Sequence, residues 1–203
     1  MRRDGKQGGV GRRVVGGRKP SPTFLIVCEG EKTEPQYFRA FGLRSAEVVG
    51  TGKNTRSLVD EVIRLKETME ERDHYWCVFD RDSFPAQNFN AALQKARHAG
   101  FEVAYSNEAF EIWYLLHFDY YSSASDRSLY RKKLSERLGR PYEKNDPTIF
   151  ESLQDRLPEA IKYARKLRES YDPEHNPEQD NPCTTVYLLV QQLLEARGKT
   201  VQP

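Results

Sequence analysis

Residues 23–34 read Thr-Phe-Leu-Ile-Val-Cys-Glu-Gly-Glu-Lys-Thr-Glu, and this stretch decides the fold. A run of apolar residues ends at Glu29 and Gly30, and a helical pattern follows. A strand buried on both faces of a parallel sheet is typically apolar throughout, and such sheets bind ligands beyond the carboxyl ends of their strands. The stretch therefore predicts a buried parallel strand that places Glu29 at the edge of an α/β sheet.

A second stretch repeats this arrangement, because the apolar residues 75–79 run directly into Asp80, Arg81 and Asp82. Alternate residues of an extended chain point the same way, so both aspartates can face one cation. An isolated Asp-x-Asp is more often a solvated turn, but three carboxylates meeting at one sheet edge would repel one another without a cation. We therefore expect Glu29, Asp80 and Asp82 to hold Mg²⁺ or Mn²⁺, the divalent ions that oxygen ligands select.

Strands and helices alternate over the first half of the chain, with strands expected at 23–28, 45–50, 75–79 and 101–105. Short connections between them predict a parallel four-stranded sheet with right-handed crossovers, flanked by helices. If the two strands with acidic ends are neighbours, the strand order is 2-1-3-4 and ligands bind where the order reverses. Thr33 or Glu34 is expected to cap a first helix beginning at Pro35.

From about residue 107 onward the sequence reads as helical, with Ser106-Asn107 as a helix-starting pair. An apolar helix is expected at 110–118 and a basic amphipathic helix at 126–138. Further helices are expected at 158–168 and from Thr184 or Thr185 onward.

Three parts are therefore expected in the 203 residues: a disordered basic tail (1–20), an α/β core (21–118) and a helical C-terminal part packed on it (119–203). The tail has seven Lys or Arg residues against one Asp, whereas the whole chain has a net charge of +2. Such a tail either grips phosphates or only extends the chain. No apolar run approaches the roughly 18 residues of a membrane span, and three cysteines suggest no disulfide framework. We expect a cytoplasmic protein without a membrane segment.

Gly30-Glu31-Lys32-Thr33 invites comparison with a phosphate-binding loop, because glycine, lysine and threonine follow a strand. A Walker-type loop needs a second glycine and four residues before the lysine, which this chain lacks. We therefore exclude such a nucleotide site at this strand end. Lys32 is either a contact to a substrate phosphate at the helix start or an ordinary surface lysine.

The pairing of Cys-Glu-Gly-x-Lys-Thr-Glu at 28–34 with Phe-Asp-Arg-Asp at 79–82 resembles the Toprim fold. The likeness extends to Ser-Asn-Glu-Ala-Phe-Glu-Ile-Trp-Tyr-Leu-Leu-His-Phe at 106–118 and Asn-Pro-Cys-Thr-Thr-Val at 181–186, which resemble segments of RloB-like proteins. The resemblance implies a bacterial phage-defence protein that works with an ABC-type ATPase. It also implies a Mg²⁺-dependent phosphodiesterase, an endonuclease acting on DNA or RNA.

What the resemblance implies for the site is one or two metal ions held by Asp80 and Asp82, with Glu29 as a ligand or general base. Glu111 is the candidate fourth carboxylate, because it is an acid in an otherwise apolar helix that starts near the same edge. The alternative for Glu111 is a buried structural glutamate paired with a base such as Arg81.

The basic helix at 126–138 is the best candidate for binding a nucleic-acid backbone in the folded part, with Arg131 and Lys132 as the expected contacts and Arg81 as a further one. The alternative is an ordinary solvated face. His117 is expected to be a core histidine, since it shares a helix face with Trp113 rather than with Glu111.

Two other functions stay open: a metal-binding Toprim module that recognises nucleic acid or a partner ATPase without cutting, and an RNA-processing ribonuclease. The sequence also leaves the oligomeric state open, a homodimer included.

Overall fold

A computed structural model describes residues 21–81 and 85–199. The predicted basic tail (1–20) and the predicted metal ligand Asp82 lie outside the described residues.

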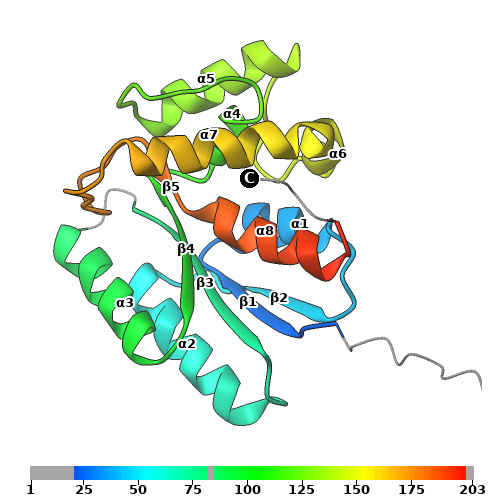
Figure 1. Ribbon diagram of the computed structural model, residues 1–203, viewed down its shortest axis with the longest axis vertical. Coiled ribbons are helices and arrows are strands. Elements are labelled where there is room, and N and C mark those ends of the chain that lie inside the picture. The colour runs from blue at the N-terminus through cyan, green and yellow to red at the C-terminus, as the bar shows by residue number, and fades with distance from the viewer. Residues whose placement is uncertain (1–20, 82–84, 200–203) are drawn as a thin grey trace, which may run out of the picture.

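One five-stranded sheet organises the described chain, in the order β2-β1-β3-β4-β5 (Figure 1). Its strands are β1 (Phe24–Cys28), β2 (Ala46–Gly50), β3 (His74–Asp80), β4 (Glu102–Asn107) and β5 (Cys183–Thr184). The first four are parallel, with Cys28 paired to both Gly50 and Val78, so the predicted order 2-1-3-4 is confirmed. The predicted count of four strands is wrong, because β5 adds an antiparallel strand beside β4. A strand of two residues has no alternating pattern that the sequence could reveal.

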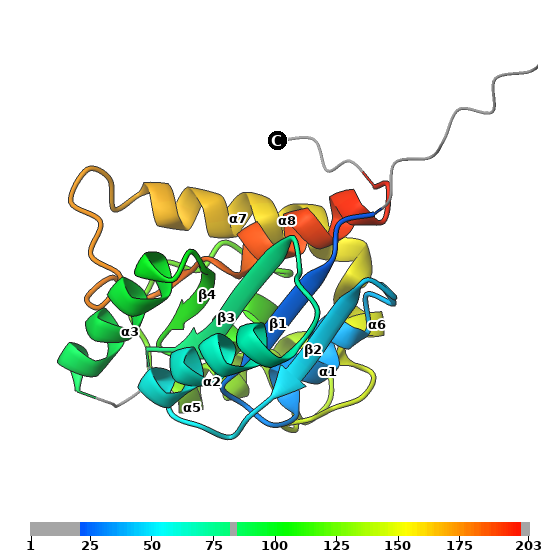
Figure 2. The same ribbon diagram turned by 90° about the horizontal axis from the view of Figure 1, so that it is seen from below.

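Helices cover both faces of the sheet (Figures 1 and 2). They are α1 (Thr33–Arg39), α2 (Thr55–Thr68), α3 (Ala86–His98), α4 (Glu111–Leu115), α5 (Arg127–Leu138), α6 (Ile149–Leu153), the 3₁₀ turn η1 (Gln154–Arg156), α7 (Leu157–Glu169) and α8 (Val186–Ala196). Successive residues of β1 alternate between the two resulting cores. Leu25 and Val27 pack with residues of α2 and α3, whereas Phe24 and Ile26 pack with the other helices.

Some predicted boundaries are wrong in informative ways. Ser106 and Asn107 continue β4 and pair with Thr184 and Cys183, so they do not start a helix. Helix α1 begins at Thr33 with no side-chain cap. Both errors lie at the carboxyl ends of strands, where polar residues serve the sheet edge rather than a helix.

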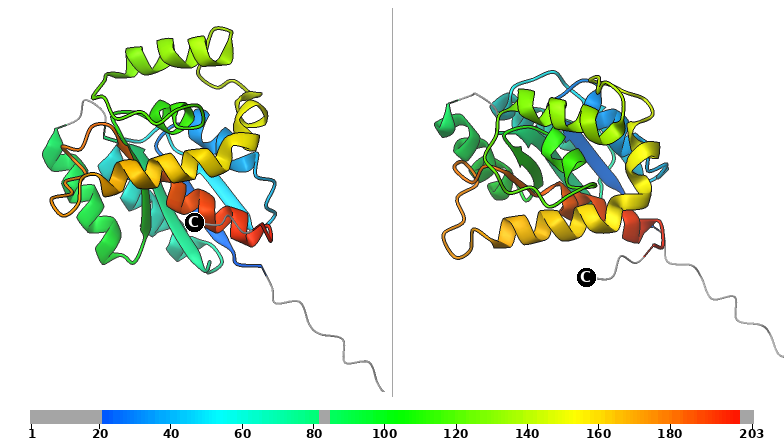
Figure 3. Two further views of the ribbon diagram at one scale, coloured as in Figure 1. Left: turned by 45° about the horizontal axis from the view of Figure 1, so that its top comes forward. Right: turned by 90° about the horizontal axis from the view of Figure 1, so that it is seen from above.

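Helix α5 lies near the carboxyl ends of the central strands, as its ion pairs to Asp80 and Glu111 show. In the view from above in Figure 3 it crosses in front of the sheet. Asp126 caps it by accepting a hydrogen bond from the backbone N–H of Leu129 at 2.9 Å. No helix within residues 21–81 and 85–199 is long and apolar enough to cross a membrane.

Candidate metal and phosphate site

Glu29 and Asp80 meet where the parallel strands β1 and β3 end. The backbone N–H of Glu29 donates to the carbonyl of Val78 at 2.8 Å, which extends the ladder by one residue. The backbone N–H of Asp80 donates to Glu29 Oε2 at 3.2 Å, and the Thr55 hydroxyl donates to Glu29 Oε1 at 3.4 Å. The Glu29 carboxylate is therefore fixed at the junction of β1 and β3.

Glu34 is a carboxylate that the sequence suggested only as a helix cap. Its side chain folds back over Gly30, where a Cβ atom would lie only 2.0 Å from Glu34 Oε2. That oxygen is buried and has no hydrogen-bond partner among the described residues. A glycine four residues before an acid is the sequence signal for this placement of Glu34. Only glycine at position 30 leaves room for a carboxylate that folds back over it.

Glu111 opens α4 and is 3% exposed. Its partner is Arg131 of α5, whose Nε donates to Glu111 Oε1 at 3.3 Å. One turn earlier in the same helix, Arg127 Nη2 lies 3.8 Å from Asp80 Oδ2. Two arginines of one helix thus face two carboxylates of the sheet edge.

The electrostatics join these acids into one group, which we call the acidic cluster: Glu29, Glu34, Asp80 and Glu111. Burial raises the pKa of Asp80 well above its usual range, and repulsion from Glu34, Glu111 and Glu29 raises it further, whereas Arg127 lowers it. Burial also raises the pKa of Glu34, and repulsion from Glu111 adds to the effect. The neighbouring acids are thus close enough to Asp80 and Glu34 to disfavour the charged forms of these two side chains.

The donor set of the acidic cluster is chemically suited to a hard divalent cation. All its ligand atoms are carboxylate oxygens, and Glu34 Oε2 is a buried acceptor with no donor in the described chain. Within residues 21–81 and 85–199, however, no three acidic, histidine or cysteine side chains are already placed as a metal site. An ion would need these side chains to draw together or would need a further ligand, for which Asp82 is the sequence candidate.

The predicted phosphate-binding residues differ in how close they lie to the acidic cluster. Lys32 precedes α1 and is exposed, and Lys132 is exposed on α5. Arg81 Nε donates to the backbone carbonyl of Glu178 at 3.2 Å, which directs it toward the loop before β5. Arg131 contacts the acidic cluster through its ion pair with Glu111.

His117 is a core residue, as the sequence indicated. It is 1% exposed, its Nδ1 donates to the carbonyl of Trp113 at 2.9 Å, and its ring packs edge-on against the Trp113 ring. Burial lowers its pKa to about 4, so the ring is neutral near pH 7. It does not belong to the acidic cluster.

A family model described as "RloB-like protein" matches residues 24–193, from the first residue of β1 into α8. No curated protein matches the chain, and neither does any solved structure.

Proposed function

This chain belongs to the RloB-like family, and we propose that it is a metal-dependent phosphodiesterase of the Toprim type that cuts nucleic acid. The observation that carries the proposal is the meeting of Glu29, Glu34, Asp80 and Glu111 at the carboxyl edge of a parallel sheet. Burying several carboxylates together is unfavourable unless a cation compensates them, and a phosphodiester substrate needs such a cation.

The residues that would hold Mg²⁺ or Mn²⁺ are those of the acidic cluster, with Asp82 as an added ligand. When bound, the ion would polarise a phosphoryl oxygen and make a bound water more acidic. Asp80 anchors the set, because it ends β3 and its backbone N–H holds the Glu29 carboxylate in place. Glu34 contributes the acceptor that has no partner in the described chain.

Arg127 and Arg131 are the proposed contacts to the scissile phosphate. Guanidinium groups bind phosphates through charge-assisted hydrogen bonds, and both side chains already lie beside the acids. In this proposal their guanidinium groups turn from the carboxylates to the phosphate as the ion and substrate enter. Lys32 and Lys132 then lie on the exposed approach as weaker, screened contacts.

A second candidate function is a module that binds nucleic acid or a partner without cutting. It is favoured by the arginines that already compensate Asp80 and Glu111, and by the lack of a ready-made metal geometry among the described residues. Metal-dependent cleavage separates the two functions.

The test uses the full chain with Mg²⁺, Mn²⁺ or EDTA on DNA, ribosomal RNA and tRNA. Asp80→Asn should abolish cleavage that requires the metal. Asp60→Asn is the matched control, because Asp60 is an exposed aspartate that pairs with Lys95 between α2 and α3. Cleavage that survives Asp80→Asn would refute the catalytic assignment, whereas binding without any cleavage would support the second function.

The family resemblance leads us to propose a role in bacterial phage defence beside an ABC-type ATPase. Cells carrying the chain with its partner ATPase should resist phage infection, and the Asp80→Asn variant should abolish this resistance. Plating efficiency measures the effect, and resistance that survives the substitution would contradict a role for the acidic cluster.

A further inference from the structure

A cavity of about 550 Å³ lies between α3, β4, α7 and α8. This volume is within the range of roughly 300–1,000 Å³ that is typical of small-molecule sites. None of the residues of the acidic cluster lines it. The cavity follows the part of β4 that β5 leaves uncovered, since β5 pairs only with Ser106 and Asn107.

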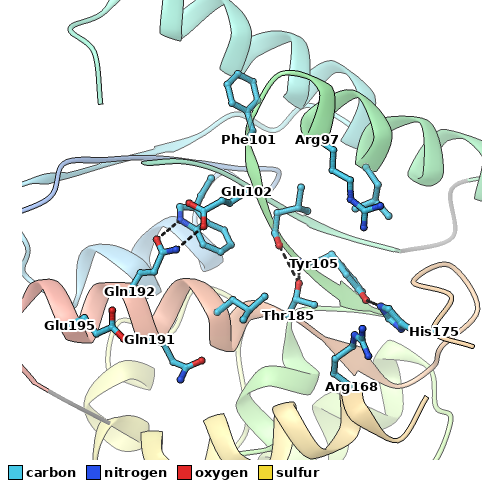
Figure 4. A pocket seen from close by; sticks show the side chains of 14 residues that line it. Arg97, Phe101, Glu102, Tyr105, Arg168, His175, Thr185, Gln191, Gln192 and Glu195 are labelled. Carbon is cyan, nitrogen blue, oxygen red and sulfur yellow. Dashed lines mark hydrogen bonds between the residues drawn. The ribbon is translucent and has the colours of Figure 1, made fainter. Parts of the chain in front are cut away.

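One end of the cavity is cationic. Arg97 from the last turn of α3 and Arg168 from the last turn of α7 lie on this side (Figure 4). Arg168 Nη1 donates to Asp172 at 2.6 Å, but Asp172 is half exposed and does not line the cavity. The Arg97 side chain is exposed and forms no hydrogen bond or ion pair with other residues of the described chain.

A relay of hydrogen bonds fixes the wall between these two arginines. Asp180 accepts a hydrogen bond from His175 Nδ1 and one from the backbone N–H of Asn176 at 2.9 Å. On the other side of the ring, His175 Nε2 lies at hydrogen-bond distance, 3.0 Å, from the Tyr105 hydroxyl. The cationic end is therefore built on a rigid support that the acidic cluster does not use.

The opposite end presents amides and carboxylates, as Figure 4 shows. Gln192 Oε1 accepts from Trp76 Nε1 at 3.1 Å, and Gln192 Nε2 donates to Glu102 Oε1 at 2.6 Å. These bonds fix both side chains, while Gln191 and Glu195 line the same end. Glu102 Oε2 also lies 3.1 Å from His74 Nδ1. The acceptors left for the amino and ring N–H groups of a nucleobase are therefore the remaining lone pairs of these oxygens and the side chains of Gln191 and Glu195.

Part of the lining is apolar. Leu93, Val103 and Leu188 contribute to it. Leu188 is 41% exposed and is one of the two large apolar side chains exposed among the described residues. A cavity that combines a cationic end, an end rich in acceptors and apolar lining fits a flat ring linked to a phosphate.

We propose that this cavity binds a nucleoside phosphate, with the phosphate between Arg97 and Arg168 and the base toward Gln191, Gln192 and Glu102. The ligand is either a free nucleotide or the phosphorylated end of a strand, since both offer the same chemistry. This binding is independent of the cleavage proposed for the acidic cluster.

The test is calorimetry of the full chain in EDTA with the four ribonucleoside monophosphates and with the corresponding nucleosides. At least one monophosphate should bind, and its nucleoside should bind about ten- to hundredfold more weakly, as expected for a lost charge-assisted hydrogen bond. Arg97→Gln should weaken binding by a similar factor. Leu188→Glu should abolish binding, because it places a negative charge on the apolar part of the lining.

Arg44→Gln is the control, because Arg44 is an exposed arginine outside the cavity, and it should bind as the wild type does. Asp80→Asn should also bind normally, which separates this site from the acidic cluster. A 5′-phosphorylated oligonucleotide that binds more tightly than the free nucleotide identifies the strand end as the ligand, and weaker binding identifies the nucleotide. Equal binding of nucleotide and nucleoside, unchanged binding by Arg97→Gln, or no binding of any monophosphate at millimolar concentration would overturn the proposal.

Discussion

Replacing Gly30 by alanine would put a methyl group into the space that the Glu34 carboxylate occupies. The new Cβ would lie 2.0 Å from Oε2, 2.8 Å from Cδ and 3.0 Å from Oε1 of Glu34. Ordinary contact begins at 3.4 Å, so Oε2 would have to move by the difference between 3.4 and 2.0 Å, which is 1.4 Å. A misplacement of about 1 Å in a catalytic constellation can reduce the rate about 100-fold. We expect Gly30→Ala to lose cleavage activity by that order.

The fold should tolerate the same substitution. The clash is with the end of a flexible side chain, and Glu34 Oε2 has no hydrogen bond to lose within the described chain. Replacing glycine by alanine in a compatible backbone gains about 0.4–1 kcal/mol through the unfolded state. The free energy of unfolding should therefore stay within about 1 kcal/mol of the wild type. Gly50→Ala is the contrasting variant, because its Cβ would lie 2.6 Å from the backbone oxygen of Glu31, and it should destabilise the fold.

The assay combines urea unfolding, Mn²⁺ binding by calorimetry and kcat/KM on the cleaved nucleic acid. A Glu34→Ala background completes the cycle, because it removes the carboxylate that the methyl group displaces. Gly30→Ala should have little further effect in that background, whereas independent effects would add. Wild-type activity in Gly30→Ala, or an equal loss in both backgrounds, would refute a role for the placement of Glu34.

Three further predictions follow from the charges of the described residues. Asp80→Asn should raise the free energy of unfolding of the metal-free protein by about 1 kcal/mol at pH 8, because burial and like charges raise the pKa of Asp80. This gain should vanish as the pH falls and the wild-type carboxyl takes up a proton in the folded state. A gain that persists at low pH would contradict this cause. Arg131→Gln should lower the free energy of unfolding in urea by about 1–3 kcal/mol, because it leaves the buried Glu111 without the guanidinium group of its ion pair. The control Lys132→Gln should lower it by less than about 0.5 kcal/mol. Equal losses in the two variants would argue against the pairing. His117 should stay neutral at pH 5 in NMR spectra of the folded protein, because burial lowers its pKa to about 4; an imidazolium signal there would show that the ring is hydrated.

Much of the sheet could be predicted because long apolar strands carry their own signal. The runs that form β1 and β3 are apolar and end in acids. If strands with acidic ends are neighbours, the order 2-1-3-4 follows, and β1 does pair with β3. β5 is different, because it has two residues and forms only where Cys183 and Thr184 meet Asn107 and Ser106. Its pairing depends on contacts between residues far apart in the chain, and a local pattern does not contain them.

In the acidic cluster, too, some residues are indicated by the local sequence pattern, whereas the placement of one depends on the folded structure. The sequence indicates Glu29, Asp80 and Glu111, because each follows or opens an apolar segment at a sheet edge. The sequence indicates Glu34 only as a helix cap, since an acid before a helix usually serves that purpose. Its true placement depends on the space above Gly30, which is a property of the folded turn and not of helix propensity.

The charges explain why α5 lies where it does. With every acid of the cluster ionised, its four carboxylates face Arg127 and Arg131, and Lys144 also acts on Glu34, so the cluster keeps an excess of negative charge that a bound cation would reduce. In the metal-free protein the raised pKa values of Asp80 and Glu34 reduce that excess by favouring bound protons. An entering cation would take over this compensation and leave the guanidinium groups able to bind a phosphate anion. The helix that stabilises the metal-free cluster is thus also the element placed to bind the substrate, so the affinities for metal and phosphate should be coupled through Arg127 and Arg131.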